Sequence, residues 1–375
     1  MDDRHFVKTK QRIVVKVGTS TLTHDTGRLN YHRIERLVVE LSDLANQGKQ
    51  IILVTSGAVG AGLAPLGLKE KPKTIREKQA AAAVGQGLLL HLYEKLFREY
   101  GQVVGQILLT RADSVDRKKF INSRNTLLTL LEMGVIPIIN ENDAVAIDEL
   151  KIGDNDTLSA MVSSMVEADL LIILSDVDGV YTKNPQTYED AVLIPEIDEI
   201  TKHLYEISGG AGSLRGTGGM YTKIQAASIA MNAGVDMVIA SGGVDGVLRH
   251  ICAGEIIGTY FKAKDSRPHV KKRWIASGTK VKGNLIIDKG CRDALVNKGS
   301  SLLPVGIVAI TGEFSEGDTV SIGYDDMEIA KGISNYDSKA ILRIKGLQTA
   351  ELPGELGNEY CHEEVIHRDN LVVLL

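Results

Sequence analysis

The stretch RIVVKVGTS, residues 12–20, decides the fold, because it joins a run of β-branched residues to a lysine and a glycine. A near-continuous apolar run of this length is typical of a strand buried on both faces of a parallel sheet. Lys16 stands between Val15 and Val17, and a lysine is costly to bury without a partner. Either the strand is an edge and Lys16 faces water, or Lys16 reaches a phosphate at the strand end, where Gly18 lets a ligand approach the backbone.

Further runs of the same kind follow along the first two thirds of the chain, and segments with helical spacing of apolar residues separate them. Gly134 and Gly234 each follow such a segment, at the position where a helix end favours a left-handed residue. Buried strands with helices between them indicate an α/β fold, a mostly parallel sheet sandwiched by helices. The predicted strands are residues 12–17, 50–55, 103–110, 135–140, 170–175 and 236–241, and the clearest helices are 34–44, 125–133 and 221–233.

The pattern changes near residue 262, where a basic segment broken by Pro268 is typical of a linker. Beyond it, short strand-like runs between turn residues indicate a small, mostly-β module with one short helix at 292–298. We therefore predict an α/β domain at 1–262, a linker at 263–279 and the β module at 280–375.

The composition narrows the class of protein. The chain has 375 residues, 43% of them hydrophobic and 24% charged, with a net charge of −5. These values are typical of a globular protein of two or three domains and give no reason to expect nucleic acid or a membrane as partner. The three cysteines include no Cys-x-x-Cys pair, so neither a zinc site nor a disulfide framework is indicated. A charged N-terminus and apolar runs of only strand length favour a cytoplasmic enzyme.

Polar and glycine-rich residues follow the predicted strands where they end. Because ligands of an open parallel sheet bind at the carboxyl ends of its strands, these residues predict one active-site rim. After the second strand, TSGAVGAG (residues 55–62) reads G-x-x-G-x-G, the reverse of a dinucleotide fingerprint, so we exclude a Rossmann cofactor site. Two interpretations stay open here, an anion site at a helix N-terminus after Ser56 and a tight strand-to-helix turn.

The most polar stretch of the α/β domain is NENDAVAIDELKIGDNDTLSA, residues 140–160. It clusters Asp143, Asp154, Asn155 and Asp156 after a buried strand. A helix cap would explain one of the aspartates at 154 and 156, but not all four polar residues. The spacing excludes an EF-hand, and binding of a metal or an amino group stays open.

Two later strand ends carry further candidates. SDVDGVYTKNP (residues 175–185) contains an Asp-Gly dipeptide typical of a turn, and Ser175 and Asp176 precede it. GAGSLRGTGGMYTKIQAA (residues 210–227) is a glycine-rich segment that ends in a lysine before a helix, but it lacks the spacing of a P-loop. None of the nine histidines lies in these motifs, so Ser-His-Asp hydrolysis and a histidine metal site are poorly supported.

Taken together and in this order, the motifs resemble those of the glutamate 5-kinases, within the amino-acid kinase superfamily. The resemblance covers nearly the whole chain, and the module after residue 280 is similar to a PUA domain. Ser175 stands where that family often has threonine, and both supply a hydroxyl. The motifs that carry the resemblance are VVKVGTS, LVTSGAVGAG, INENDAV, GDNDTLSA, LSDVDGVYTKNP and GTGGMYTKIQAA.

The resemblance implies ATP-dependent phosphorylation of the side-chain carboxylate of glutamate to glutamyl 5-phosphate, the first step of proline biosynthesis. Lys16 and Lys223 would act on the phosphates as catalytic residues, and Asp156 would orient them. Glutamate would be held by Ser56, Asp143 and Asn155. The ATP site would be lined by Lys16, Ser175, Asp176, Thr217, Gly218, Gly219, Met220, Tyr221, Thr222 and Lys223.

The resemblance also implies Mg²⁺ on the phosphates, feedback inhibition by proline, a homo-oligomer, and glutamyl phosphate reductase as the partner that takes up the labile product. A kinase of the same superfamily for another small acid or for UMP is one alternative. The other is a secondary RNA-binding role of the PUA-like module. Residues 280–375 carry ten Lys/Arg against fifteen Asp/Glu, which is the wrong sign for a phosphate-binding face.

Overall fold

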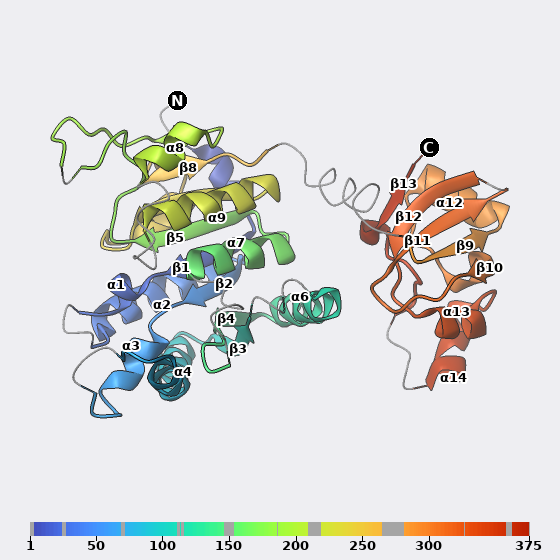
Figure 1. The fold of residues 1–375 in the computed structure, drawn as a ribbon, viewed down its shortest axis with the longest axis horizontal. Coiled ribbons are helices and arrows are strands. Elements are labelled where there is room, and N and C mark those ends of the chain that lie inside the picture. Colours follow the sequence, from blue (N-terminus) through green and yellow to red (C-terminus); the bar gives the residue numbers. More distant parts are fainter. Residues whose placement is uncertain are drawn as a thin grey trace. The chain divides into compact units, whose positions relative to one another are not determined.

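The chain forms two compact units, Met1–Asp265 and Ser266–Leu375, in this computed structural model (Figure 1). The predicted linker at 263–279 lies almost wholly outside the described residues, so its boundaries stay predictions. None of the described helices is both long and apolar enough to cross a membrane. The structure describes residues 4–24, 28–68, 72–110, 113, 116–145, 154–185, 187–208, 219–264, 281–325, 327–357 and 362–374.

The first unit is built on one eight-stranded sheet. Its strands are β1 (Arg12–Val17), β2 (Gln50–Thr55), β3 (Val103–Leu109), β4 (Val135–Glu141), β5 (Leu170–Ser175), β6 (Glu196–Ile197), β7 (Asp236–Ser241) and β8 (Thr259–Phe261). They lie in the order β3-β4-β2-β1-β5-β7-β8-β6, and Figure 1 shows this succession from β8 down to β3. All pairs from β3 to β7 are parallel, whereas β8 runs antiparallel to β7. The carboxyl ends of β1, β2, β4 and β5 therefore open on one edge.

Helices cover both faces of this sheet. They are α1 (Thr19–Leu22), α2 (Tyr31–Asn46), α3 (Ala58–Leu63), α4 (Ile75–Glu99), α6 (Arg117–Glu132), α7 (Asn155–Met165), α8 (Lys202–Ile207), α9 (Met220–Asn232) and α10 (Val247–Cys252), with a 3-10 turn η1 (His5–Thr9). α2, α4 and α10 share one apolar cluster with the sheet, and α6, α7, α8 and α9 share the other. In β1, Val15 and Val17 belong to the first cluster and Val14 to the second. Lys16 follows Val14 at a spacing of two, so it projects toward the face of α7 and α9.

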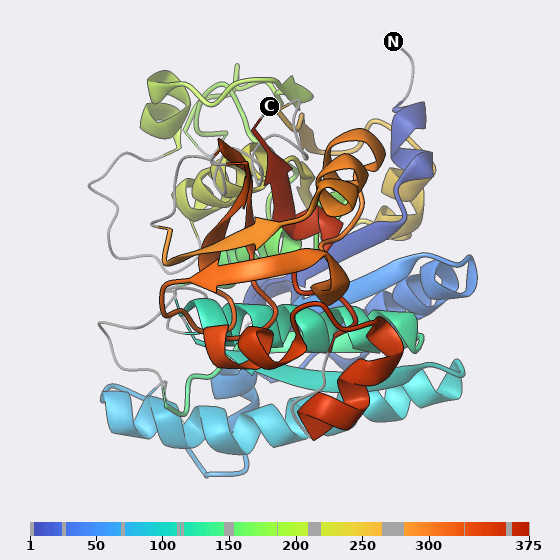
Figure 2. The ribbon, with the colours of Figure 1, turned by 90° about the vertical axis from the view of Figure 1, so that its right-hand side faces the viewer.

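α3 and α4 pack closely because two glycines meet where the helices cross. A Cβ atom on Gly62 would lie 2.0 Å from the carbonyl oxygen of Ala81, and one on Gly85 would lie 1.8 Å from that of Ala58. Gly57 leads from β2 into α3 with a φ of +99°, a left-handed value that favours glycine. These glycines let α4, the long pale-blue helix of Figure 2, approach the polar turn that follows β2.

The second unit is built on a five-stranded sheet in the order β10-β9-β11-β12-β13. Its elements are β9 (Gly283–Ile287), α12 (Lys289–Lys298), η3 (Pro304–Gly306), β10 (Ile307–Thr311), β11 (Thr319–Tyr324), β12 (Met327–Ile333), α13 (Ser338–Ile344), η4 (Thr349–Glu351), α14 (Leu352–Leu356), η6 (Arg368–Asn370) and β13 (Leu371–Val373). The mostly-β character of the module is confirmed. The expectation of a single short helix is wrong, because α13 and α14 also form. Asp337 caps α13 by accepting a hydrogen bond from the backbone N–H of Ala340 at 2.7 Å.

The predicted α/β fold is confirmed, and each predicted strand of the first unit is present. Gly134 and Gly234 have left-handed φ values of +73° and +75°, as expected at helix ends. β1 lies between β2 and β5 in the middle of the sheet. The explanation of Lys16 as a water-facing residue of an edge strand is therefore wrong.

The close contact between α3 and α4 predicts that one added methyl group at Gly85 lowers the stability of the protein strongly. Gly85→Ala should lower the free energy of unfolding by about 2 kcal/mol or more, because backbone atoms must move to admit the Cβ atom. Gly87→Ala is the matched control on the same helix, since its Cβ atom would meet nothing within 4 Å. It should stabilise the chain by up to about 1 kcal/mol through helix propensity. Calorimetric unfolding measures both, and equal shifts would contradict the packing described.

Candidate active site

Lys16, Asp156 and Lys223 come from three elements and meet at one buried point. Lys16 projects from β1, Asp156 from the first turn of α7 and Lys223 from the first turn of α9. Nζ of Lys16 lies 2.5 Å from Oδ1 of Asp156, and Nζ of Lys223 lies 3.1 Å from Oδ2. Lys16 is 6% exposed, Asp156 0% and Lys223 4%. One carboxylate therefore holds two buried ammonium groups close together.

The charges of this cluster keep Asp156 ionised. Burial acts to raise the pKa of Asp156, but the ammonium groups of Lys16 and Lys223 outweigh it and lower the pKa below the ordinary value of 3.8. The hydroxyl of Thr222 lies 2.9 Å from Oδ2 of the same carboxylate, within hydrogen-bond distance. Asp156 thus provides a fixed negative charge at neutral pH.

Asp154, rather than Asp156, caps α7. Its carboxylate accepts a hydrogen bond from the backbone N–H of Thr157 at 2.8 Å. Burial and the charge of Asp156 raise the pKa of Asp154 above 3.8. The two neighbouring carboxyl groups therefore have different tasks, one at the helix end and one between the lysines.

Asn155 ties the start of α7 to the end of β2. Its Nδ2 lies 2.8 Å from the carbonyl oxygen of Thr55, 2.8 Å from Oγ of Ser56 and 3.0 Å from Oδ1 of Asn140. Residues from two predicted strand ends and from the start of α7 thus meet in one hydrogen-bond network, beside the charged cluster that begins at the next residue, Asp156. This agrees with the predicted rim, and it brings together two predicted substrate residues, Ser56 and Asn155.

Asn140 and Gln86 extend this network, and the sequence motifs predict a role for neither. Nδ2 of Asn140 donates to Oε1 of Gln86 at 2.8 Å, and Oδ1 of Asn140 accepts from the backbone N–H of Glu141 at 2.9 Å. Asn140 is the last residue of the strand predicted at 135–140 and belongs to the motif INENDAV. Gln86 lies in α4, where the only signal in the sequence is one polar residue among alanines and glycines.

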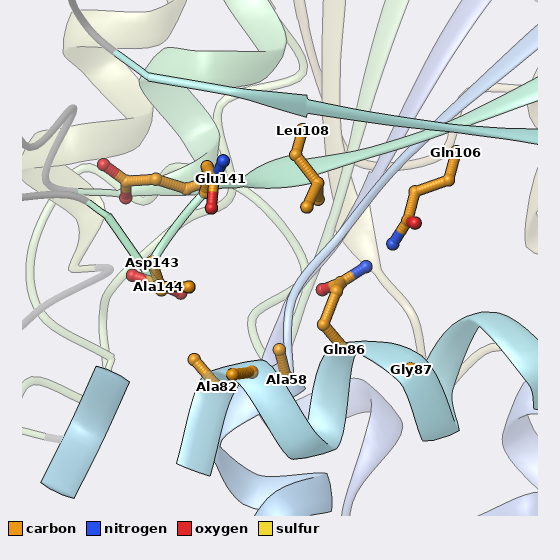
Figure 3. Close-up of a pocket in the computed structure, with 11 residues that line it drawn as sticks. Ala58, Ala82, Gln86, Gly87, Gln106, Leu108, Glu141, Asp143 and Ala144 are labelled. Carbon is orange, nitrogen blue, oxygen red and sulfur yellow. The ribbon is translucent and has the colours of Figure 1, made fainter. Parts of the chain in front are cut away.

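A cavity of about 360 Å³ adjoins the network (Figure 3). α3 and α4 line it with Ala58, Ala82, Ala83, Gln86 and Gly87, so small residues leave the space open. Gln106 and Leu108 of β3 line another side, and the end of β4 adds Glu141, Asn142, Asp143 and Ala144. Of the predicted substrate residues, Asp143 lines this cavity. Asn155 is linked to the cavity wall through Asn140, which is hydrogen-bonded to the lining residue Gln86.

The predicted ATP residues lie on two segments that the structure describes in part. Ser175 is the last residue of β5, and its hydroxyl donates to Oδ1 of Asp176 at 3.0 Å. Gly219 is the N-cap of α9, whose first turn holds Met220, Tyr221, Thr222 and Lys223. Thr217 and Gly218 lie outside the described residues. Within the described ranges, no three His, Cys, Asp or Glu side chains are placed to hold a metal ion.

Comparison with known families shows which family the chain belongs to. Residues 11–241 match the model described as the amino acid kinase family, and residues 283–356 match that of the PUA domain. The chain belongs to the amino acid kinase family. The family resemblance inferred from the ordered motifs is thereby confirmed.

Curated relatives of this family match the chain along nearly its full length. A glutamate 5-kinase from Caldanaerobacter subterraneus subsp. tengcongensis is 55% identical over 97% of this chain and 98% of its own. A glutamate 5-kinase from Moorella thermoacetica is 54% identical over 97% of this chain and 96% of its own. A glutamate 5-kinase from Carboxydothermus hydrogenoformans is 49% identical over 99% of this chain and 100% of its own.

The charged cluster predicts a pH-dependent loss of stability in one variant. Asp156→Asn should lower the free energy of unfolding by about 3–5 kcal/mol near neutral pH, because two buried ammonium groups lose their shared carboxylate. The folded-state pKa of Asp156 is lowered, so its stabilisation is present above the ordinary value of 3.8 and is lost as the pH falls through the lowered pKa. Urea unfolding over a pH series measures the difference.

Asp154→Asn is the matched control for this variant. Asparagine is as good an N-cap as aspartate, so the stability should change by less than about 1 kcal/mol. Equal losses in the two variants would contradict the assignment of the buried charge to Asp156.

Proposed function

We propose that the chain is a glutamate 5-kinase, which transfers the terminal phosphoryl group of ATP to the side-chain carboxylate of L-glutamate. The product would be L-glutamyl 5-phosphate, in the first step of proline biosynthesis. The observation that carries the proposal is the pair of buried lysines on Asp156, in a family of amino acid kinases. The full-length match to proteins named glutamate 5-kinase supports this substrate.

The chemistry needs cations more than it needs a base. The side-chain carboxylate of glutamate has an ordinary pKa of about 4.3, so it is already ionised at neutral pH and attacks without losing a proton. The main obstacle is repulsion between this anion and the polyphosphate of ATP. Lys16 and Lys223 approach from different elements and would neutralise the transferring group, so catalysis is positioning plus electrostatics.

Asp156 would then act as a positioning residue. Its two carboxylate oxygens each face one lysine, which fixes the separation and the direction of the ammonium groups before substrates bind. Lysine is flexible and strongly hydrated, so a fixed partner reduces the cost of holding it in place. Mg²⁺, which prefers phosphate and water oxygens, would enter with ATP and share the charge.

The substrate end would be formed by Ser56, Asp143 and Asn155. Oγ of Ser56 faces an N–H donor of Asn155, so the serine hydroxyl hydrogen points elsewhere and suits a carboxylate. Asp143 lines the cavity and provides a negative charge for the α-ammonium of an amino acid. Ser175, Asp176 and the start of α9 would line the nucleotide side, together with Thr217 and Gly218.

Kinases for other acceptors make up the first alternative. A coupled ATPase assay with glutamate, aspartate and UMP tests it directly, and turnover with glutamate alone is expected. Turnover with aspartate or UMP but not with glutamate would refute the proposal.

Further implications of the family resemblance stay predictions. They are feedback inhibition by proline, transfer of the product to glutamyl phosphate reductase, and a homo-oligomer. An inhibition assay with millimolar proline and a mass measurement in solution address the first and the last. For the RNA alternative, the excess of acidic residues after residue 280 stays unfavourable.

Loss of one lysine should affect the chemical step. Lys223→Met is expected to lower kcat by about a hundredfold or more, since a lost transition-state donor costs about 3 kcal/mol. Lys202→Met, on the exposed surface of α8, is the control and should keep the original kcat. Steady-state assays measure both, and near-normal turnover of the Lys223 variant would refute its catalytic role.

Asp143 should matter for one substrate only. Asp143→Ala is expected to raise KM for glutamate by about tenfold or more, because a charged hydrogen bond to the α-ammonium is lost. KM for ATP should stay the same. Parallel titrations of the two substrates distinguish the outcomes, and equal increases in both KM values would contradict the placement of Asp143.

A further inference from the structure

A backbone group fixes the orientation of the Gln86 amide. The N–H of Glu141 can only donate, so the Asn140 atom 2.9 Å away must be its oxygen, Oδ1. The nitrogen of Asn140 is then the donor toward Gln86, and the Gln86 atom that receives it, 2.8 Å away, is Oε1. Nε2 of Gln86 is therefore turned away from Asn140. Among the described residues, none accepts a hydrogen bond from it, although Gln86 lines the cavity.

A second amide faces Gln86 across the cavity. Figure 3 shows the side chains of Gln86 and Gln106 pointing toward each other, away from Glu141 and Asp143. The cavity therefore has an end with amide donors and an end with carboxylates. An α-amino acid has the complementary polarity, because its α-carboxylate accepts hydrogen bonds and its α-ammonium donates them.

We infer that Gln86, with Gln106, binds the α-carboxylate of the amino-acid substrate and so determines specificity, an inference that rests on the proposed function. The site takes a carboxylate that is not phosphorylated, while the reacting carboxylate extends toward Lys16 and Lys223. Neutral amides suit this task, because they bind one carboxylate without adding a cation that would compete for the phosphates of ATP.

The hydrogen-bond network connects this site to the charged cluster. Gln86 orients Asn140, and Oδ1 of Asn140 lies 3.0 Å from Nδ2 of Asn155, the residue before Asp156. A role limited to holding Asn140 would use Oε1 alone. The donor Nε2, turned into the cavity, is the part that points to a ligand.

The test separates these two roles of Gln86. Gln86→Glu keeps an oxygen for Asn140 but replaces the cavity donor with a negatively charged acceptor. The substrates compared are glutamate and its α-amide, used as substrates or as competing ligands. The variant should raise KM for glutamate by about tenfold or more and that for the α-amide much less, with KM for ATP unchanged. Discrimination in favour of glutamate should therefore be lost.

Gln106→Met is the second variant, because its exposed side chain makes no hydrogen bond to Asn140 among those described. It should reduce the same discrimination. Gln102→Glu, just before β3 and bonded to Asn46, is the control and should preserve it. Equal losses for glutamate and the α-amide, or unchanged values in both variants, would overturn the inference. If the unaltered protein phosphorylates no glutamate at all, the proposed function fails instead, together with the inference that rests on it.

Discussion

The first unit depends on one shared carboxylate, that of Asp156. Without it, Lys16 would place a charge in the middle of an apolar sheet, and the buried side chain of Lys223 would place another beneath the first turn of α9. Their common partner turns two costly burials into a compact ion cluster, whose geometry joins β1, α7 and α9. The same constraint that stabilises the fold also fixes both ammonium groups on one carboxylate, which is the arrangement that the proposed phosphoryl transfer requires.

The close packing of α3 and α4 is the second constraint, and it acts on the hydrogen-bond network beside the cavity. Gly62 and Gly85 let two backbones approach to a distance that no side chain would permit. This contact brings Gln86 within 2.8 Å of Asn140 at the end of β4. In the same helix, the hydroxyl of Tyr93 lies 2.9 Å from that of Thr55 at the end of β2. α4 therefore holds the ends of two strands in register with each other.

Candidate site residues could be predicted from the sequence where their chemistry conflicts with that of their neighbours in the chain. Lys16 stands out as a charge within an apolar strand, and Lys223 as a lysine after a glycine-rich segment. Gln86 could not be found in this way, because its role depends on Asn140, which is 54 residues away in the chain. The three-residue strand β8 and the seven-residue helix α13 were missed for another reason. A helix this short has fewer than two turns, and a strand this short has too few residues for apolar and polar positions to alternate. The spacing of apolar residues therefore cannot identify such elements.

The failed match to a P-loop is explained by the way charge is distributed here. A P-loop concentrates backbone N–H groups and one lysine on a single segment that wraps a phosphate. In this chain the two lysines come from elements that are distant in sequence, and a carboxylate holds them. An acceptor that is itself an anion has to approach the phosphoryl group between positive charges. Two cations on separate elements would suit such an acceptor, and the end of β2, where Ser56 contacts Asn155 at the start of α7, adjoins the residue that holds both lysines.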